Sequence, residues 1–94
     1  MYNRGMGTEG YEVEVESSVL KALRQLSRSM QERLVAAMGA LGDDPRPHGS
    51  EKLTDVAGYR ARVGDYRIVY RVDDAARVVT VTRVGHRSQV YRRR

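Results

Sequence analysis

Two runs of alternating apolar and polar residues, 59–63 and 66–72, meet at Gly64-Asp65. Glycine followed by a polar residue suits a two-residue hairpin turn of type II′, because the first position of that turn needs a positive φ. The sequence therefore predicts a β-hairpin in which Arg62 lies opposite Arg67. The full predicted register pairs Val63 with Tyr66, Arg62 with Arg67, Ala61 with Ile68 and Arg60 with Val69.

The pleat of this hairpin sorts its side chains into an apolar face and a basic face. The apolar face carries Tyr59, Ala61, Val63, Tyr66, Ile68, Tyr70 and Val72, and the basic face carries Arg60, Arg62, Arg67 and Arg71. Like charges directly across a strand pair destabilise it, so a sheet built only for stability tends to avoid Arg62 opposite Arg67. The pair makes sense if an anion such as a phosphate belongs between the two side chains.

The first half of the chain predicts one strand and two helices. Residues 11–16 alternate strictly, with three glutamates on the polar side. Ser17 or Ser18 can cap the helix that follows. A break at 27–29 separates it from a second helix at about 30–41, whose apolar residues recur at helical spacing.

The second half completes the sheet. A loop rich in proline and glycine spans 42–50, and a Val- and Thr-rich third strand of the meander spans 77–84. The order β-α-α-β-β-β predicts an α+β domain: an antiparallel sheet with an α-helical hairpin packed on one face. The first strand is expected to return and join that sheet, and the basic face is expected to stay open. Residues 1–10 are expected to form a flexible N-terminal tail and residues 11–94 a single domain.

Charge is distributed unevenly along the chain. The net charge is +5, but residues 59–94 carry +7 and residues 1–58 carry −2. A basic excess of this kind suits nucleic acid, an acidic protein or an anionic membrane. The chain has no cysteine, which excludes disulfides and thiolate metal sites, and its apolar runs are too short to span a membrane. We expect a cytoplasmic protein.

The basic face is a candidate phosphate surface. Arginine presents a rigid fork of donors and stays charged, so several arginines can stabilise the extra negative charge of a five-coordinate phosphate. If the polymer is RNA, its own 2′-hydroxyl can be the nucleophile, and then no metal or cofactor is required. His86 is the side chain whose titration range best suits proton transfer. His48 is interpreted as a loop residue, and Arg71 and Arg77 as solvated charges.

Two segments carry a resemblance to a known family. Tyr-Arg-Ala-Arg-Val-Gly-Asp-Tyr-Arg-Ile-Val-Tyr-Arg-Val-Asp at 59–73 and Val-Thr-Arg-Val-Gly-His-Arg-Ser-Gln-Val-Tyr at 81–91 resemble the second half of a RelE-type toxin of the RelE/ParE superfamily. The loop with Pro45, Pro47 and Gly49 and the element order fit as well, so the resemblance covers about 11–91.

This resemblance implies a type II toxin–antitoxin toxin that acts as a ribosome-dependent, metal-independent mRNA endonuclease and inhibits translation. It implies that Arg60 and Arg62 orient the substrate and help to activate the 2′-hydroxyl. It also implies that Arg67 and Arg87 stabilise the phosphate and help the leaving group. Tyr91 is expected to stack on a base, although it can also simply cover an edge of the core. The family pattern often has a pair of lysines where this chain has Arg60 and Arg62, so the general base stays open, with His86 as a candidate.

The resemblance also implies partners. They are a cognate acidic helical antitoxin, mRNA in the ribosomal A site, the ribosome, and operator DNA only through the antitoxin, with no membrane. Two other functions stay open: a ParE-like inhibitor of DNA gyrase, and a catalytically degenerate module that only binds its antitoxin.

Overall fold

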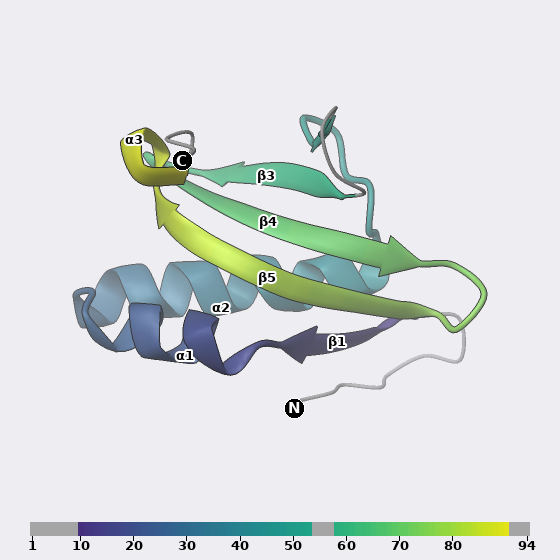
Figure 1. Ribbon diagram of the computed structural model, residues 1–94, viewed down its shortest axis with the longest axis horizontal. Coiled ribbons are helices and arrows are strands. Elements are labelled where there is room, and N and C mark those ends of the chain that lie inside the picture. Colours follow the sequence, from purple (N-terminus) through teal and green to yellow (C-terminus); the bar gives the residue numbers. More distant parts are fainter. Residues whose placement is uncertain (1–9, 54–57, 91–94) are drawn as a thin grey trace.

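The computed structural model describes residues 10–53 and 58–90, without the side chains of the last two of these residues. Five strands form one twisted sheet in the order β1-β5-β4-β3-β2 (Figure 1). The elements are β1 (Glu12–Val15), α1 (Ser17–Arg24), α2 (Arg28–Asp43), β2 (Glu51–Lys52), β3 (Tyr59–Val63), β4 (Tyr66–Asp73), β5 (Val78–His86) and α3 (Arg87–Val90). The tail predicted for 1–10 lies, apart from Gly10, outside the described residues.

The predicted α+β class is confirmed, and so is the register of the central hairpin. β3 and β4 pair antiparallel with Arg62 opposite Arg67 and Ala61 opposite Ile68. Gly64 has a φ of 61°, which a residue with a side chain rarely adopts, so this position of the turn favours glycine. β1 does return to the sheet as an edge strand, but it runs parallel to β5. The sheet is consequently mixed, whereas the sequence predicted an antiparallel one.

The two long helices begin and end close to where the pattern predicts. Ser27 caps α2, since its hydroxyl accepts a hydrogen bond from the backbone N–H of Met30 at 3.2 Å. The predicted cap of α1 by Ser17 or Ser18 is wrong, because both serines lie inside the first turn and the N-cap position is Glu16. α2 extends two residues beyond the prediction at each end: it begins at Arg28, directly after the Ser27 cap, and continues through Gly42 to Asp43.

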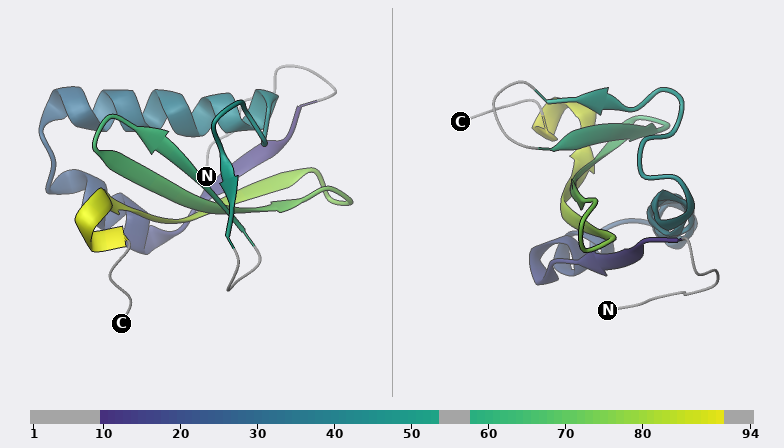
Figure 2. Two further views of the ribbon diagram at one scale, coloured as in Figure 1. Left: turned by 90° about the horizontal axis from the view of Figure 1, so that it is seen from above. Right: turned by 90° about the vertical axis from the view of Figure 1, so that its right-hand side faces the viewer.

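The core lies between the sheet and the helix pair, which covers one face only (Figure 2). Its fully buried side chains come from the two helices and from β4 and β5: Val19, Leu34, Ile68, Tyr70, Val79 and Val81. Among the described residues, no helix is long and apolar enough to cross a membrane.

A β-bulge in β5 decides which side chains of that strand face the core. Val69 on β4 pairs with Arg83, but Tyr70 pairs with Val81, so Thr82 is an extra residue opposite no partner on β4. Its hydroxyl donates to the carbonyl of Val69 at 3.3 Å. Val79 and Val81 face the core, and simple alternation would turn Arg83 inward as well. The bulge turns Arg83 outward instead.

The loop between α2 and β2 is fastened to the sheet at two points. The hydroxyl of Tyr70 donates to the carbonyl of Pro45 at 2.7 Å in the core. Arg46 donates to the hydroxyl of Tyr59 at 2.9 Å and to both carboxylate oxygens of Asp74 at 2.8 and 3.2 Å. These contacts fix the loop that leads directly into β2.

The buried hydrogen bond of Tyr70 provides a test of this anchoring. Tyr70→Phe keeps the ring but leaves the Pro45 carbonyl without its donor, so we expect the free energy of unfolding to fall by about 1–2 kcal/mol in urea denaturation. Tyr66→Phe is the control, because the hydroxyl of Tyr66 makes no hydrogen bond to the residues that the structure describes. Equal stability of the two variants would contradict the anchoring role.

Candidate phosphate-binding face

Two cross-strand rows build a basic surface at one end of the sheet, on the face away from α1 and α2. The first row runs Glu51, Arg60, Val69, Arg83 across β2, β3, β4 and β5, and the second runs Arg62, Arg67, Gly85 across β3, β4 and β5. We call Arg60, Arg62, Arg67 and Arg83 the arginine face. Gly85 has no side chain, so the second row is open beside Arg67 on the β5 side.

The four arginines differ in exposure. Arg62 and Arg83 are exposed, whereas the side chain of Arg60 is only 24% exposed. Arg67 is 7% exposed, so the prediction of an open basic face holds at Arg62 but is wrong at Arg67. The reason is that β4 is central and the Arg67 guanidinium folds back to its own strand end, where it donates to the carbonyls of Tyr66 at 3.2 Å and Gly64 at 3.4 Å. Arg67 forms the floor of the surface, and its neighbours form the rim.

A carboxylate lies among these arginines. Glu51 on β2 is paired directly opposite Arg60 and accepts a hydrogen bond from its guanidinium in an ion pair. The pKa of Glu51 is lowered first by this hydrogen bond and then by the charge of Arg60. Burial acts in the other direction, and the charges of Arg62 and Arg67 lower the pKa by smaller amounts. Part of the repulsion between Arg62 and Arg67 is therefore offset by an anion that the chain itself supplies.

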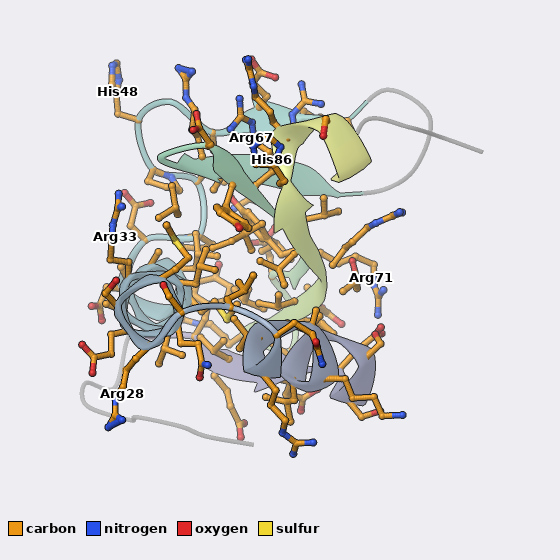
Figure 3. All side chains as sticks on the ribbon, turned by 90° about the vertical axis from the view of Figure 1, so that its left-hand side faces the viewer. Arg28, Arg33, His48, Arg67, Arg71 and His86 are labelled. Carbon is orange, nitrogen blue, oxygen red and sulfur yellow. The ribbon has the colours of Figure 1, made fainter. Side chains whose placement is uncertain are left out.

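His86 lies at the same end of the sheet as Arg67 (Figure 3). It pairs with Tyr66, and Gly85 pairs with Arg67, so alternation places the imidazole on the side of Tyr66. The two rings are 5.7 Å apart and nearly perpendicular. The backbone N–H of Ser88 donates to Nδ1 of His86 at 3.3 Å, and the Ser88 hydroxyl lies 3.1 Å from the same nitrogen. Nδ1 is thus engaged locally, and Nε2 is the atom left for chemistry.

Arg87 begins α3, which follows β5 and lies next to the start of β4 (Figure 1). Its backbone N–H donates to the carbonyl of Asp65 at 2.8 Å, so the C-terminal helix is tied to the hairpin turn. The side chain of Arg87 is exposed. Arg71 extends away from this end of the sheet (Figure 3) and pairs with Thr80, which agrees with a solvated charge. The predicted stacking residue Tyr91 lies outside the described residues.

A groove of about 990 Å³ opens beside Arg62, between the end of α2, the following loop and the β3–β4 turn. Asp43, Asp44 and Asp65 line it, so the basic character of the surface ends at Arg62. Within the described parts of the chain, no group of three or more His, Asp or Glu side chains is placed to hold a metal ion.

Sequence reasoning missed Glu51 and Arg83 as members of this surface. Glu51 belongs to a two-residue strand after a proline- and glycine-rich loop, a segment too short to show alternation. Arg83 is outward only because of the bulge at Thr82. The available signal for Arg83 was its position two residues before Gly85, since glycine inside a strand often marks a bulge nearby.

The chain is similar to known toxins of type II toxin–antitoxin systems. The family model of the ParE toxin of the type II toxin–antitoxin system parDE matches residues 11–91. Toxin RelG of Mycobacterium tuberculosis is 41% identical over 58 residues, covering 61% of this chain and 67% of that toxin. Toxin RelE of the same organism is 31% identical over 84 residues, covering 87% of each.

Solved structures show the same likeness. The toxin–antitoxin complex RelBE2 from M. tuberculosis contains a chain that superposes with a TM-score of 0.76 at 28% identity, covering 89% of this chain and 99% of that one. The archaeal RelE–RelB complex from Pyrococcus horikoshii matches with a TM-score of 0.73 at 28% identity, covering 85% and 98%.

The opposed arginines generate a prediction about stability. Arg62→Gln removes one member of a like-charged cross-strand pair, so we expect the free energy of unfolding to rise by about 0.2–1 kcal/mol. The matched control is Arg71→Gln, because Arg71 on β4 is exposed, as Arg62 on β3 is, but pairs with the uncharged Thr80. Chemical denaturation at low salt measures both variants. A loss of stability in Arg62→Gln would show that Arg62 is a structural residue.

Proposed function

Since this chain belongs to the ParE toxin family of type II toxin–antitoxin systems, and its relatives include RelE-type toxins, we propose that it is a ribosome-dependent mRNA endonuclease. The observation that carries the proposal is the exposed Arg62 held directly opposite the buried Arg67, with Arg60 and Arg83 in the adjacent row. Such a surface is costly for folding and well suited to a phosphate in its transition state.

The proposed reaction needs no group beyond the RNA and the protein. The 2′-oxygen attacks the adjacent phosphorus, and the bond from phosphorus to the 5′-oxygen of the next nucleotide breaks. The products are a 2′,3′-cyclic phosphate and a free 5′-hydroxyl. One proton leaves the 2′-hydroxyl and one joins the departing 5′-oxygen. The reaction inhibits translation because the message is cut.

The arginines divide the work on the phosphate. Arg67 is fixed by its backbone contacts and forms a preorganised donor, which costs no reorganisation in the transition state. Arg60 and Arg62 orient the substrate, and Arg87 approaches the leaving group from the start of α3. Arg83 adds a charge that completes the first row. Tyr91 is proposed to stack on a base, as the family resemblance implies.

Two side chains near this surface are suited to proton transfer. The backbone N–H of Ser88 donates to Nδ1 of His86, so the neutral ring carries its proton on Nε2. We propose that His86 acts through Nε2 as the donor to the leaving oxygen. Glu51 is the carboxylate closest in register to the arginines and is the candidate acceptor.

The proposed partners follow from the family. Relatives of this fold are found in complexes with RelB antitoxins, and we propose that this toxin has a cognate acidic helical antitoxin, through which it reaches operator DNA. The +7 charge of residues 59–94 supports an acidic partner segment. The ribosome, mRNA in its A site and the cytoplasm are the proposed setting.

A second function is favoured by one observation, since the matching family model is that of the ParE toxin. A ParE-like protein would inhibit DNA gyrase by binding and would cut no RNA. A supercoiling assay with purified gyrase separates the two functions. Gyrase inhibition without mRNA cleavage would replace the endonuclease proposal, and neither activity would indicate a degenerate antitoxin-binding module.

The endonuclease proposal is tested on ribosomes stalled with a defined codon in the A site. The wild-type protein should cut within that codon and leave a 2′,3′-cyclic phosphate, and a 2′-deoxy nucleotide at the cut position should block the reaction. Arg62→Gln and Arg87→Gln should each lower the single-turnover rate by roughly 100-fold or more, as loss of one transition-state donor does.

Arg71→Gln is the matched control and should cut at the wild-type rate, because this arginine extends away from the arginine face. Both test positions are exposed, so the variants should fold, and circular dichroism checks this. If both single variants cut at the wild-type rate, the assigned site is wrong. If the protein cuts at the 2′-deoxy position, the proposed attack by the 2′-hydroxyl is wrong.

A further inference from the structure

Glu51 occupies a place in the arginine face that a phosphate oxygen could take. Its carboxylate accepts a hydrogen bond from Arg60 and lies within the electrostatic influence of Arg62 and Arg67. A carboxylate group and a phosphate group can each accept two parallel hydrogen bonds from the guanidinium fork. The Glu51 carboxylate therefore occupies the place on Arg60 that a substrate phosphate would take.

The placement of Glu51 is built into the fold. β2 has only two residues, and they pair with Arg60 and Tyr59 of β3. The backbone N–H of Leu53 donates to the carbonyl of Gly58 at 2.9 Å, which closes the connection behind β2. On the other side, the loop before β2 is held by the hydrogen bond from Tyr70 to Pro45. Glu51 is thus delivered to Arg60 from a strand anchored at both ends.

The ion pair is nevertheless accessible from solvent. The side chain of Glu51 is 62% exposed, whereas that of Arg60 is only 24% exposed. An entering phosphate can therefore displace the carboxylate while Arg60 stays in place. An exposed ion pair of this kind is weak, so displacement costs little once a phosphate is correctly positioned.

We propose that Glu51 is a specificity-determining residue, an internal anion that competes with RNA phosphate for Arg60 and so weakens binding to any RNA that is not held in register over the arginine face. The inference rests on the proposed phosphate-binding role of that face and adds to it a reason for discrimination. An RNA presented by the ribosome supplies its phosphate at a high local concentration and wins the competition, whereas free RNA does not.

The competition has a measurable signature in salt dependence. Each phosphate contact that a protein makes releases counterions from the nucleic acid, and for single strands the slope of log K against log salt changes by about 0.7 for each contact. In the wild-type protein the ion pair with Glu51 keeps Arg60 from contacting the phosphates of RNA that is not held over the arginine face. Removal of the carboxylate takes away this competing anion and should allow Arg60 one additional phosphate contact.

The experiment measures binding of a fluorescein-labelled, fully 2′-O-methylated uridine oligonucleotide, which the protein cannot cut by 2′-hydroxyl attack. Fluorescence anisotropy from 50 to 300 mM KCl gives affinity and salt slope. Glu51→Gln should bind roughly two- to fivefold tighter at the lowest salt, with a slope steeper by about 0.7. Glu12→Gln removes the same charge from an exposed position on the far edge strand and should leave the slope unchanged.

A second variant isolates the route through Arg60. In an Arg60→Gln background, Glu51→Gln should have no further effect on the slope, because the competitor has lost its target. If wild type binds and Glu51→Gln shows the same slope, or the increase persists without Arg60, this inference is overturned while the phosphate surface stands. If neither wild type nor Glu51→Gln binds the oligonucleotide, the phosphate surface itself fails, and the inference fails with it.

Discussion

The opposition of Arg62 and Arg67 is the constraint on which the surface depends. The hairpin turn at Gly64 fixes the register, and the register leaves no freedom to separate the two guanidinium-bearing strands. The molecule responds in two ways. Arg67 turns back to the backbone carbonyls at its own strand end, and Glu51 brings a carboxylate to the neighbouring Arg60. Both responses leave a basic surface in place and partly neutralise it.

The bulge at Thr82 extends this surface to the third strand of the meander. One extra residue reverses the alternation of β5, so that Arg83 points outward and Val84 is buried. The same reversal puts His86 on the side of Tyr66. A single local irregularity therefore adds one arginine to the arginine face and places the imidazole on the opposite side of β5.

The sequence predicted the parts of this arrangement that depend on local patterns. Alternation and the glycine turn were sufficient for the hairpin, its register and the outward position of Arg62, because each depends on residues a few positions apart. It could not predict the role of Glu51, because its partner Arg60 lies on the next strand and the two meet only when β2 pairs with β3. It also could not predict the burial of Arg67, which depends on the strands on either side of β4. The parallel pairing of β1 was also not predicted, because the alternation of a four-residue edge strand shows which side chains are buried but not the direction of the strand.

The pairing of Glu51 with Arg60 also links binding to basicity. While the carboxylate accepts the hydrogen bond from Arg60, its pKa is lowered and it is a poor proton acceptor. A phosphate that takes Arg60 removes the largest cause of that shift and adds a negative charge nearby. In the proposed reaction the pKa of Glu51 then rises back toward its ordinary value, while the charges of Arg62 and Arg67 still act to lower it. A carboxylate released in this way is a better proton acceptor than one held in an ion pair. In the proposed reaction, Glu51 could therefore take the proton of the 2′-hydroxyl in a chain that has arginine, not lysine, at positions 60 and 62.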